Sequence, residues 1–112
     1  MTRKVSWIKA ALKQVGRFPY AVQEEIADAL AIAATGEKSS SAKPLKGLGS
    51  GVLEIALQHR REAYRAVYTV KIGDDIWVVH AFQKKSKTGI TTPKHEIEIV
   101  RNRLKRLKEM IG

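Results

Sequence analysis

The 112-residue sequence contains no cysteine. It therefore cannot form disulfide bonds, use a thiol nucleophile or bind zinc through cysteine, and it fits a reducing compartment. It also has no apolar run close to the roughly 20 residues that a membrane-spanning helix needs, and its first residues do not form a secretory signal. We therefore expect a cytoplasmic protein that makes no use of a membrane.

Acidic side chains are scarce. Eleven Asp and Glu stand against 21 Lys and Arg, which gives a net charge of +10. The excess grows toward the C-terminus, because residues 84–112 carry nine basic and three acidic side chains. This distribution favours a polyanionic partner, either a nucleic acid or a large acidic protein.

The length and the hydrophobic fraction of 44% predict a single folded domain that spans residues 1–112. An extended start at residues 3–6 leads into two amphipathic helices. The first lies around residues 8–15, and the second begins after Pro19 and is closed by Gly36. Together they predict an N-terminal helical hairpin.

The hydrophobic period changes to two after a loop predicted at residues 43–51. That loop lacks the Gly-Lys-Ser/Thr ending of a nucleotide-binding P-loop. Strands are predicted at residues 52–58, 64–72 and 76–83, and their short connections indicate an antiparallel meander. A final helix starts with Thr92 as N-cap and Pro93 at the first helical position. We expect an α+β fold with the helices packed on one face of the sheet.

Arg65 lies in the middle of a predicted strand, where β-branched and aromatic residues are more usual. An unpaired buried charge is costly, so we expect it to face solvent or a partner. Lys84 and Lys85 close the next strand, and Lys87 follows two residues later. If the two strands pair across the turn at residues 73–75, Arg65 lies opposite residues 82–84 and a single basic site results. Such a site could bind a phosphate and neutralise charge during phosphoryl transfer.

The histidines do not indicate a metal site. His80 alternates with apolar residues, so we interpret it as a hydrogen-bonded sheet residue rather than a base. His59 and His95 are expected to be exposed, and the three show no metal-ligand spacing. We expect a protein without metal or other cofactor.

Three blocks of the sequence resemble the HigB branch of the RelE/ParE toxin superfamily, the phage-related toxins of type II toxin–antitoxin systems. They are Tyr-Arg-Ala-Val-Tyr at 64–68, Ala-Phe-Gln-Lys-Lys-Ser-Lys at 81–87 and Thr-Pro-Lys-His-Glu-Ile-Glu-Ile-Val at 92–100. The resemblance implies a compact microbial-RNase-like fold, with an antiparallel sheet packed against an N-terminal helical hairpin and a C-terminal helix. It also implies metal-independent cleavage of mRNA in the ribosomal A site, inhibition of translation, and a helix-turn-helix antitoxin as partner.

Within this resemblance, Arg65 matches the family's strand arginine, and Lys84 and Lys85 match its basic residues at the end of the last strand. Further cations are expected to contact RNA: Lys46, Arg60, Arg61, Lys87, Lys94 and Arg101. Glu54 and Ala56 depart from the pattern, since RelE carries lysines at the corresponding strand positions. The general base therefore cannot be carried over. A non-catalytic basic module that binds RNA or an antitoxin remains the alternative.

Overall fold

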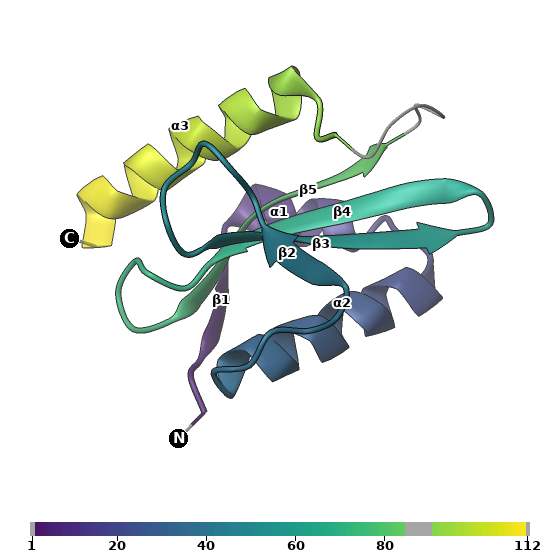
Figure 1. Ribbon diagram of the computed structural model, residues 1–112, viewed down its shortest axis with the longest axis horizontal. Coiled ribbons are helices and arrows are strands. Elements are labelled where there is room, and N and C mark those ends of the chain that lie inside the picture. Colours follow the sequence, from purple (N-terminus) through teal and green to yellow (C-terminus); the bar gives the residue numbers. More distant parts are fainter. Residues whose placement is uncertain (1, 85–90, 112) are drawn as a thin grey trace.

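The computed structural model describes residues 2–84 and 91–111. Along the chain these form β1 (Val5–Trp7), α1 (Lys9–Val15), α2 (Tyr20–Ala34), β2 (Ala42–Pro44), β3 (Val52–His59), β4 (Glu62–Thr69), β5 (Ile76–Lys84) and α3 (Lys94–Ile111). Figure 1 shows the sheet between α2 on one side and α3 on the other. The fold is α+β and is compatible with a RelE-like fold, as expected from the sequence.

The strands form one mixed sheet in the order β1-β5-β4-β3-β2. The predicted meander is confirmed, because β3 pairs antiparallel with β4, and β4 pairs antiparallel with β5. β1 runs parallel to β5 at one edge, and β2 pairs with β3 at the other. β2 lies partly within the predicted loop at 43–51, so that prediction was wrong for Lys43 and Pro44. A three-residue edge strand ending in proline has too little pattern to be detected.

The helices cover opposite faces of the sheet, so the expectation that they share one face was wrong (Figure 1). Residues of α1 and α2 pack on one face, whereas Val100, Leu104 and Leu107 of α3 pack on the other. β5 carries buried apolar side chains toward both, with Val78 in the first cluster and Val79 in the second. A strand that is apolar on both faces is covered on both faces.

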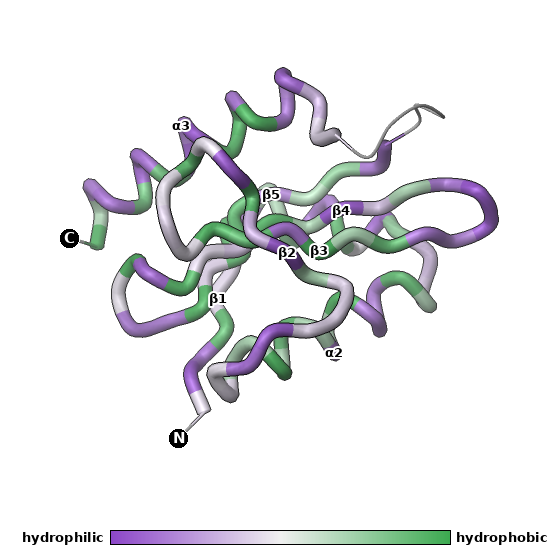
Figure 2. The backbone as a smooth tube through the Cα atoms, in the orientation of Figure 1, coloured by the Kyte–Doolittle hydropathy of each residue, from purple (hydrophilic) through white to green (hydrophobic). Residues whose placement is uncertain are grey.

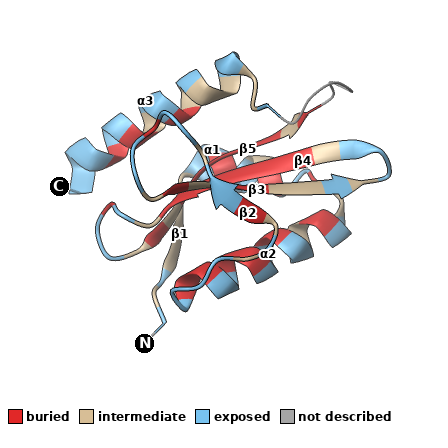
Figure 3. Ribbon diagram, viewed as in Figure 1, coloured by how far each residue is buried: buried red, intermediate tan, exposed pale blue. Residues whose placement is uncertain are grey.

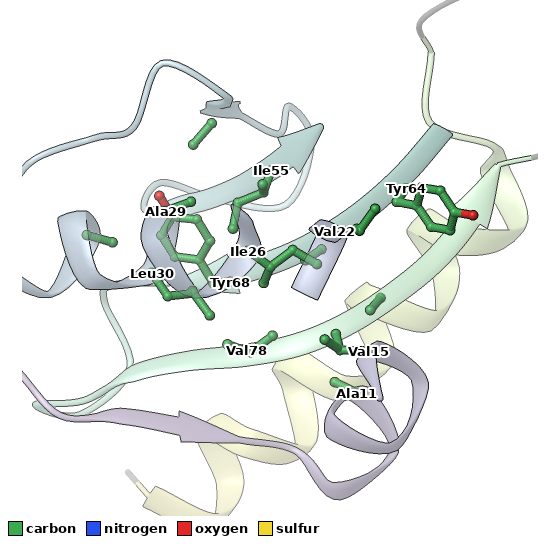
Figure 4. Packing of buried hydrophobic residues seen from close by; sticks show 14 of the residues in the cluster. Ala11, Val15, Val22, Ile26, Ala29, Leu30, Ile55, Tyr64, Tyr68 and Val78 are labelled. Atoms are coloured by element: carbon green, nitrogen blue, oxygen red, sulfur yellow. The ribbon is translucent and has the colours of Figure 1, made fainter. Parts of the chain in front are cut away.

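The core between the sheet and the N-terminal helices is formed by apolar side chains from α1, α2 and the strands β2 to β5. Figure 4 shows Val22 and Ile26 of α2 beside Ile55, Tyr68 and Val78 of the sheet. The buried residues in Figure 3 follow this layering, since the inward face of α2 and the central strands are red while the outward face of α2 is largely blue. We call this cluster the α1/α2 core.

The start of α3 differs by one residue from the prediction. The carbonyl of Pro93 accepts the first intrahelical hydrogen bond, from the amide of Ile97 at 3.1 Å. Pro93 therefore occupies the N-cap position rather than the first helical position. The Thr92 hydroxyl, predicted to cap the helix, instead donates to a carboxylate of the sheet. This hydrogen bond links the start of α3 to Glu54 of β3, which is part of the candidate site described below.

Candidate active site and basic surface

Arg65 projects from the middle of β4 toward the face that α3 covers. Its pairing partner on β5 is Phe82, and Ala63 pairs with Lys84. The expectation that Arg65 lies opposite residues 82–84 is therefore confirmed. Because directly opposed residues share a face of an antiparallel sheet, Arg65 and Lys84 project on the same side.

Arg65 is paired inside the protein. Its Nη1 donates to Glu54 Oε1 at 2.9 Å, and both side chains are buried, with 7% and 1% of their areas exposed. Glu54 lies on β3, on the same face as Ala56, the residue that pairs with Arg65. The sequence suggested no partner for Arg65, because Glu54 had the pattern of a solvent-facing member of an alternating strand. It becomes buried because α3 covers this face.

Thr92 completes this contact from the chain that leads into α3. Its hydroxyl donates to the second carboxylate oxygen of Glu54 at 2.6 Å. One carboxylate thus accepts hydrogen bonds from a strand arginine and from the residue that precedes α3 by two positions. A buried charge requires partners of this kind, since an unpaired one would cost several kcal/mol.

Lys84 is also buried, with 6% of its surface exposed, and its ammonium donates to the carbonyl of Thr91 at 2.7 Å. The predicted strand-end lysine is therefore on the same face as Arg65 and contacts the chain that enters α3. Lys85 and Lys87, the other two lysines of the predicted site, lie outside the described residues.

His80 connects the sheet to the body of α3. Its Nε2 lies 2.7 Å from Glu96 Oε1, its Nδ1 lies 3.0 Å from Arg103 Nη1, and its ring stacks on Phe82 at 5.4 Å. Because arginine can only donate, Nδ1 must accept, and the neutral ring then donates from Nε2 to Glu96. Burial lowers the pKa of His80, with the Arg103 charge acting in the same direction and Glu96 opposing it. The interpretation of His80 as a hydrogen-bonded sheet residue is confirmed.

The other two histidines make none of these hydrogen bonds. His95 is exposed in the first turn of α3, as expected. His59 is half-buried at the end of β3, so the expectation that it is exposed was wrong. Its place in the last strand pair before the turn accounts for this partial burial.

We call Glu54, Arg65, His80, Lys84, Thr92, Glu96 and Arg103 the α3-face polar cluster. Three of its hydrogen bonds tie the entry of α3 to two strands: Thr92 to β3, Glu96 to β5, and the Thr91 carbonyl to the end of β5 through Lys84. Thr91, Thr92 and Glu96 thus act as an α3 clamp over the buried charges. Chemically, the cluster combines two carboxylates, two guanidinium groups, an ammonium, an imidazole and a hydroxyl.

Arg60 and Arg61 form the exposed tip of the β3–β4 hairpin, within the short connection predicted between residues 58 and 64. Both have positive φ angles, 50° and 70°, where asparagine and glycine are the usual residues of a two-residue turn. Figure 2 shows the tip as a hydrophilic end of the sheet. It extends beyond the Ala63–Lys84 pair, so it lies at the same end of the sheet as Lys84.

The other described cations predicted to contact RNA, Lys46, Lys94 and Arg101, are exposed but more scattered. Lys94 begins α3, and Arg101 forms an ion pair with Glu98 one turn away. Lys46 lies in the loop that joins β2 to β3. Since this loop enters β3 at its first residue and the hairpin tip follows its last, Lys46 is at the opposite end of that strand from the tip. The arrangement therefore brings Arg60, Arg61 and Lys84 to one end and separates Lys46 from them.

Two further observations concern the part of the chain that the structure describes. None of its helices is long and apolar enough to span a membrane. In residues 2–84 and 91–111, no group of three or more His, Cys, Asp or Glu side chains is placed to hold a metal ion.

An α+β architecture with a five-stranded mixed sheet and three helices is compatible with a RelE-like fold. The family described as "Phage derived protein Gp49-like (DUF891)" matches residues 13–105. The chain belongs to this family, which is associated with toxin–antitoxin systems and related to the RelE and HigB toxins. No curated protein and no solved structure shows significant similarity to the chain.

Proposed function

We propose that this protein is the toxin of a type II toxin–antitoxin system and inhibits translation by cleaving mRNA on the ribosome without a metal ion. Membership of the Gp49-like family supports the toxin role. The observation that carries the nuclease role is the α3-face polar cluster, since charged groups buried together in a small domain are expensive for stability and are typical of catalytic sites.

The groups of this cluster suit attack of a ribose 2′-hydroxyl on the adjacent phosphorus. In that reaction the 2′-oxygen forms a bond to phosphorus, the bond to the 5′-oxygen breaks, and a 2′,3′-cyclic phosphate results. Arg65 would neutralise the charge that builds on the phosphate oxygens, and the Lys84 ammonium, with Lys85 following it in the chain, would stabilise the departing 5′-oxygen. Glu54, which sequence reasoning missed as a functional residue, is the group beside Arg65 that can accept the 2′-hydroxyl proton.

The α3 clamp accounts for the expected dependence on the ribosome. Arg65, Glu54 and Lys84 are all buried in the free protein, so RNA can reach them only if the entry of α3 moves aside. The exposed cations Arg60, Arg61, Lys94 and Arg101 would provide the initial electrostatic contact with ribosomal RNA. The ribosome would then hold the codon in place, and so align the 2′-hydroxyl with the phosphorus, which a flexible RNA in solution does not do.

The test is induced expression followed by growth measurement and mapping of mRNA ends. We expect growth arrest and new ends that carry 2′,3′-cyclic phosphates within translated codons. Arg65→Lys keeps a positive charge beside Glu54 but loses the planar fork, and it should reduce cleavage by about 10²-fold. Arg17→Ala, which removes an exposed arginine between α1 and α2, is the matched control and should cleave like the parent. Growth arrest without new mRNA ends would rule out the nuclease role.

The second candidate is a basic module that binds RNA or an antitoxin without catalysis. The burial of Arg65 and Lys84 favours it, because both side chains have roles in holding the fold. Ribosome binding that is retained by Arg65→Lys, with no cleavage by either protein, would identify this function instead.

A further inference from the structure

The edge of the sheet at β1 borders an open groove that the proposed nuclease role does not use. A cleft of about 500 Å³ lies between β1, the start of α1 and the C-terminal half of α3. Trp7, Trp77 and Met110 provide much of its apolar lining, and they are joined by Lys9, Arg103 and Arg106. Both tryptophans of the chain are therefore in this one groove.

A second cleft of about 220 Å³ adjoins the first one at Trp7 and runs between α1 and α2. It is lined by residues that include Leu12 and Ala27, and no charged side chain lines it among the described residues. Met110 is 81% exposed and Leu12 51% exposed, so each cleft has an apolar side chain that remains in water. We call the two clefts together the β1-edge groove.

The composition of the β1-edge groove is typical of a protein interface. Tryptophan, arginine and methionine are enriched where partners bury the centre of a contact, and tryptophan and arginine are among the commonest residues of high binding energy. Lysine- and arginine-bearing walls beside an apolar floor suit a helix that carries apolar residues on one face and acidic residues along its margins.

The basic residues of the groove favour an acidic partner. All three ionisable residues that line the larger cleft, Lys9, Arg103 and Arg106, are basic. Two such grooves would repel each other, which disfavours a contact through this surface alone between copies of the chain. Single-stranded RNA also binds cations beside aromatic rings, but the uncharged second cleft offers nothing to a phosphate backbone.

We propose that the β1-edge groove binds an acidic amphipathic helix of a partner protein. The identification of that partner as the antitoxin rests on the proposed function, whereas the groove and the chemistry of its ligand do not. Arg103 lines the groove and also donates to His80 and to the Val79 carbonyl. A helix bound there would thus contact a residue of the α3-face polar cluster without covering Arg65.

The experiment uses the whole chain and a synthetic helical peptide of five to six turns without tryptophan. The peptide carries leucine along one face, at alternating spacings of four and three residues, and glutamate at the flanking positions. Because both tryptophans line the groove, their fluorescence emission should change saturably as the peptide binds. A version with lysine in place of every glutamate should bind at least about tenfold more weakly, because it meets the basic walls with like charge.

Substitutions inside and outside the groove test whether the peptide binds there. Met110→Glu and Arg106→Glu should each weaken binding by about tenfold or more, because each puts a negative charge where the glutamates of the peptide lie. Tyr20→Glu is the control for an exposed apolar position, and Lys108→Glu is the control for charge reversal on α3. Both controls should bind within about threefold of the parent, since they lie outside the groove. Equal weakening by test and control variants, or no saturable change in emission, would overturn the proposal.

Two measurements test whether the groove binds a second copy of the chain or RNA instead of a helix. Sedimentation that gives the mass of a dimer, abolished by Met110→Glu, would assign the groove to a second copy and overturn the proposal. An RNA oligonucleotide that changes the emission of the parent but not of Met110→Glu would assign it to RNA instead. Failure of the nuclease test leaves this proposal standing, since peptide binding is measured without RNA, ribosomes or growth.

Discussion

The two faces of the sheet bury different kinds of side chain. Among the described residues, the α1/α2 core contains 16 buried hydrophobic side chains. The apolar cluster beneath α3 has eight, and beside it lie all five buried polar or charged residues of the described chain: Glu54, Arg65, Thr69, His80 and Lys84. Apolar packing stabilises a fold more reliably than buried ion pairs do. The comparison shows that the α1/α2 face supplies most of the apolar packing, whereas the α3 face holds the buried polar and charged side chains.

The largest effect on stability is expected from disrupting the Arg65–Glu54 pair, and this tests the contrast between the two faces. Arg65→Ala leaves the Glu54 carboxylate buried without its guanidinium, which should cost about 3–5 kcal/mol of unfolding free energy. Denaturant unfolding measures this. The cost is large because Arg65 is buried and paired with Glu54, unlike an arginine that faces solvent.

The double variant Glu54→Leu with Arg65→Met provides the control for this experiment. Replacing a buried ion pair by apolar residues of similar volume is often neutral or stabilising by about 1–4 kcal/mol. We expect a protein at least as stable as the parent that has lost cleavage. A double variant as unstable as Arg65→Ala would mean that the pair is retained for folding.

A substitution on the opposite face should also lower stability, but it should leave cleavage unchanged. Ile26 is 1% exposed in the α1/α2 core, and Ile26→Ala should cost about 2–5 kcal/mol through lost burial and the cavity left behind. Cleavage per folded molecule, measured at a temperature where the variant is folded, should be unchanged. A change in cleavage at constant folded fraction would show that the two faces are not separate in function.

A smaller effect concerns the protonation of His80. Burial lowers its pKa in the folded protein, so on acidification the unfolded chain takes up a proton first, near the ordinary value of about 6.5. The stability that depends on neutral His80 is complete above this pH. It is lost progressively as the pH falls below it toward the folded-state pKa. Arg103 and His95 add to the lowering of the pKa, whereas Glu96 opposes it.

The measurement compares the unfolding free energy of the parent and of His80→Gln from above pH 7 to about one unit below the ordinary histidine pKa of about 6.5. Glutamine cannot titrate, so the difference between the two proteins should change with pH. The parent should lose the greater stability toward the acid end. Parallel pH profiles would show that His80 does not respond to pH as its burial suggests.

Sequence patterns predicted which residues share a face but not which helix covers that face. The predicted strands correctly placed Arg65 opposite residues 82–84. The bounds of the first strand were less accurate, because β4 ends at Thr69, residues 70–75 form the connection to β5, and the register shifts between Val67 and Tyr68. The position of α3 could not be inferred from its own apolar stripe, because that stripe fits either face. The available signal was the run at 76–82, which is apolar at odd and even positions.

The burial of Glu54 was not predicted, for a related reason. A glutamate that alternates with leucine and isoleucine has the pattern of a half-exposed strand. Its burial depends on α3, and the face that α3 covers was unknown. The Thr92 hydroxyl was assigned to a helix cap by local preference, and the bond to Glu54, across 38 residues of sequence, took its place.

The smallest predicted effect on stability concerns the hairpin tip, which lies outside both buried faces. There the same two arginines carry both the charge and the strained backbone. Arg60 and Arg61 adopt positive φ angles that cost an ordinary residue about 1–2 kcal/mol each, whereas Asn-Gly suits such a turn. Arg60→Asn with Arg61→Gly should therefore raise the unfolding free energy by roughly 0.5–1.5 kcal/mol in denaturant unfolding.

The same double variant should weaken ribosome association and reduce its salt dependence, because each lost phosphate contact lowers the logarithmic slope by about 0.7–0.9. The matched control is Arg60→Lys with Arg61→Lys, which keeps both charges and the strained backbone. It should bind ribosomes like the parent and gain no stability, so it separates the effect of charge from that of the turn. A stabilised Asn-Gly protein that binds ribosomes with unchanged affinity and salt dependence would show that the tip arginines do not contact RNA.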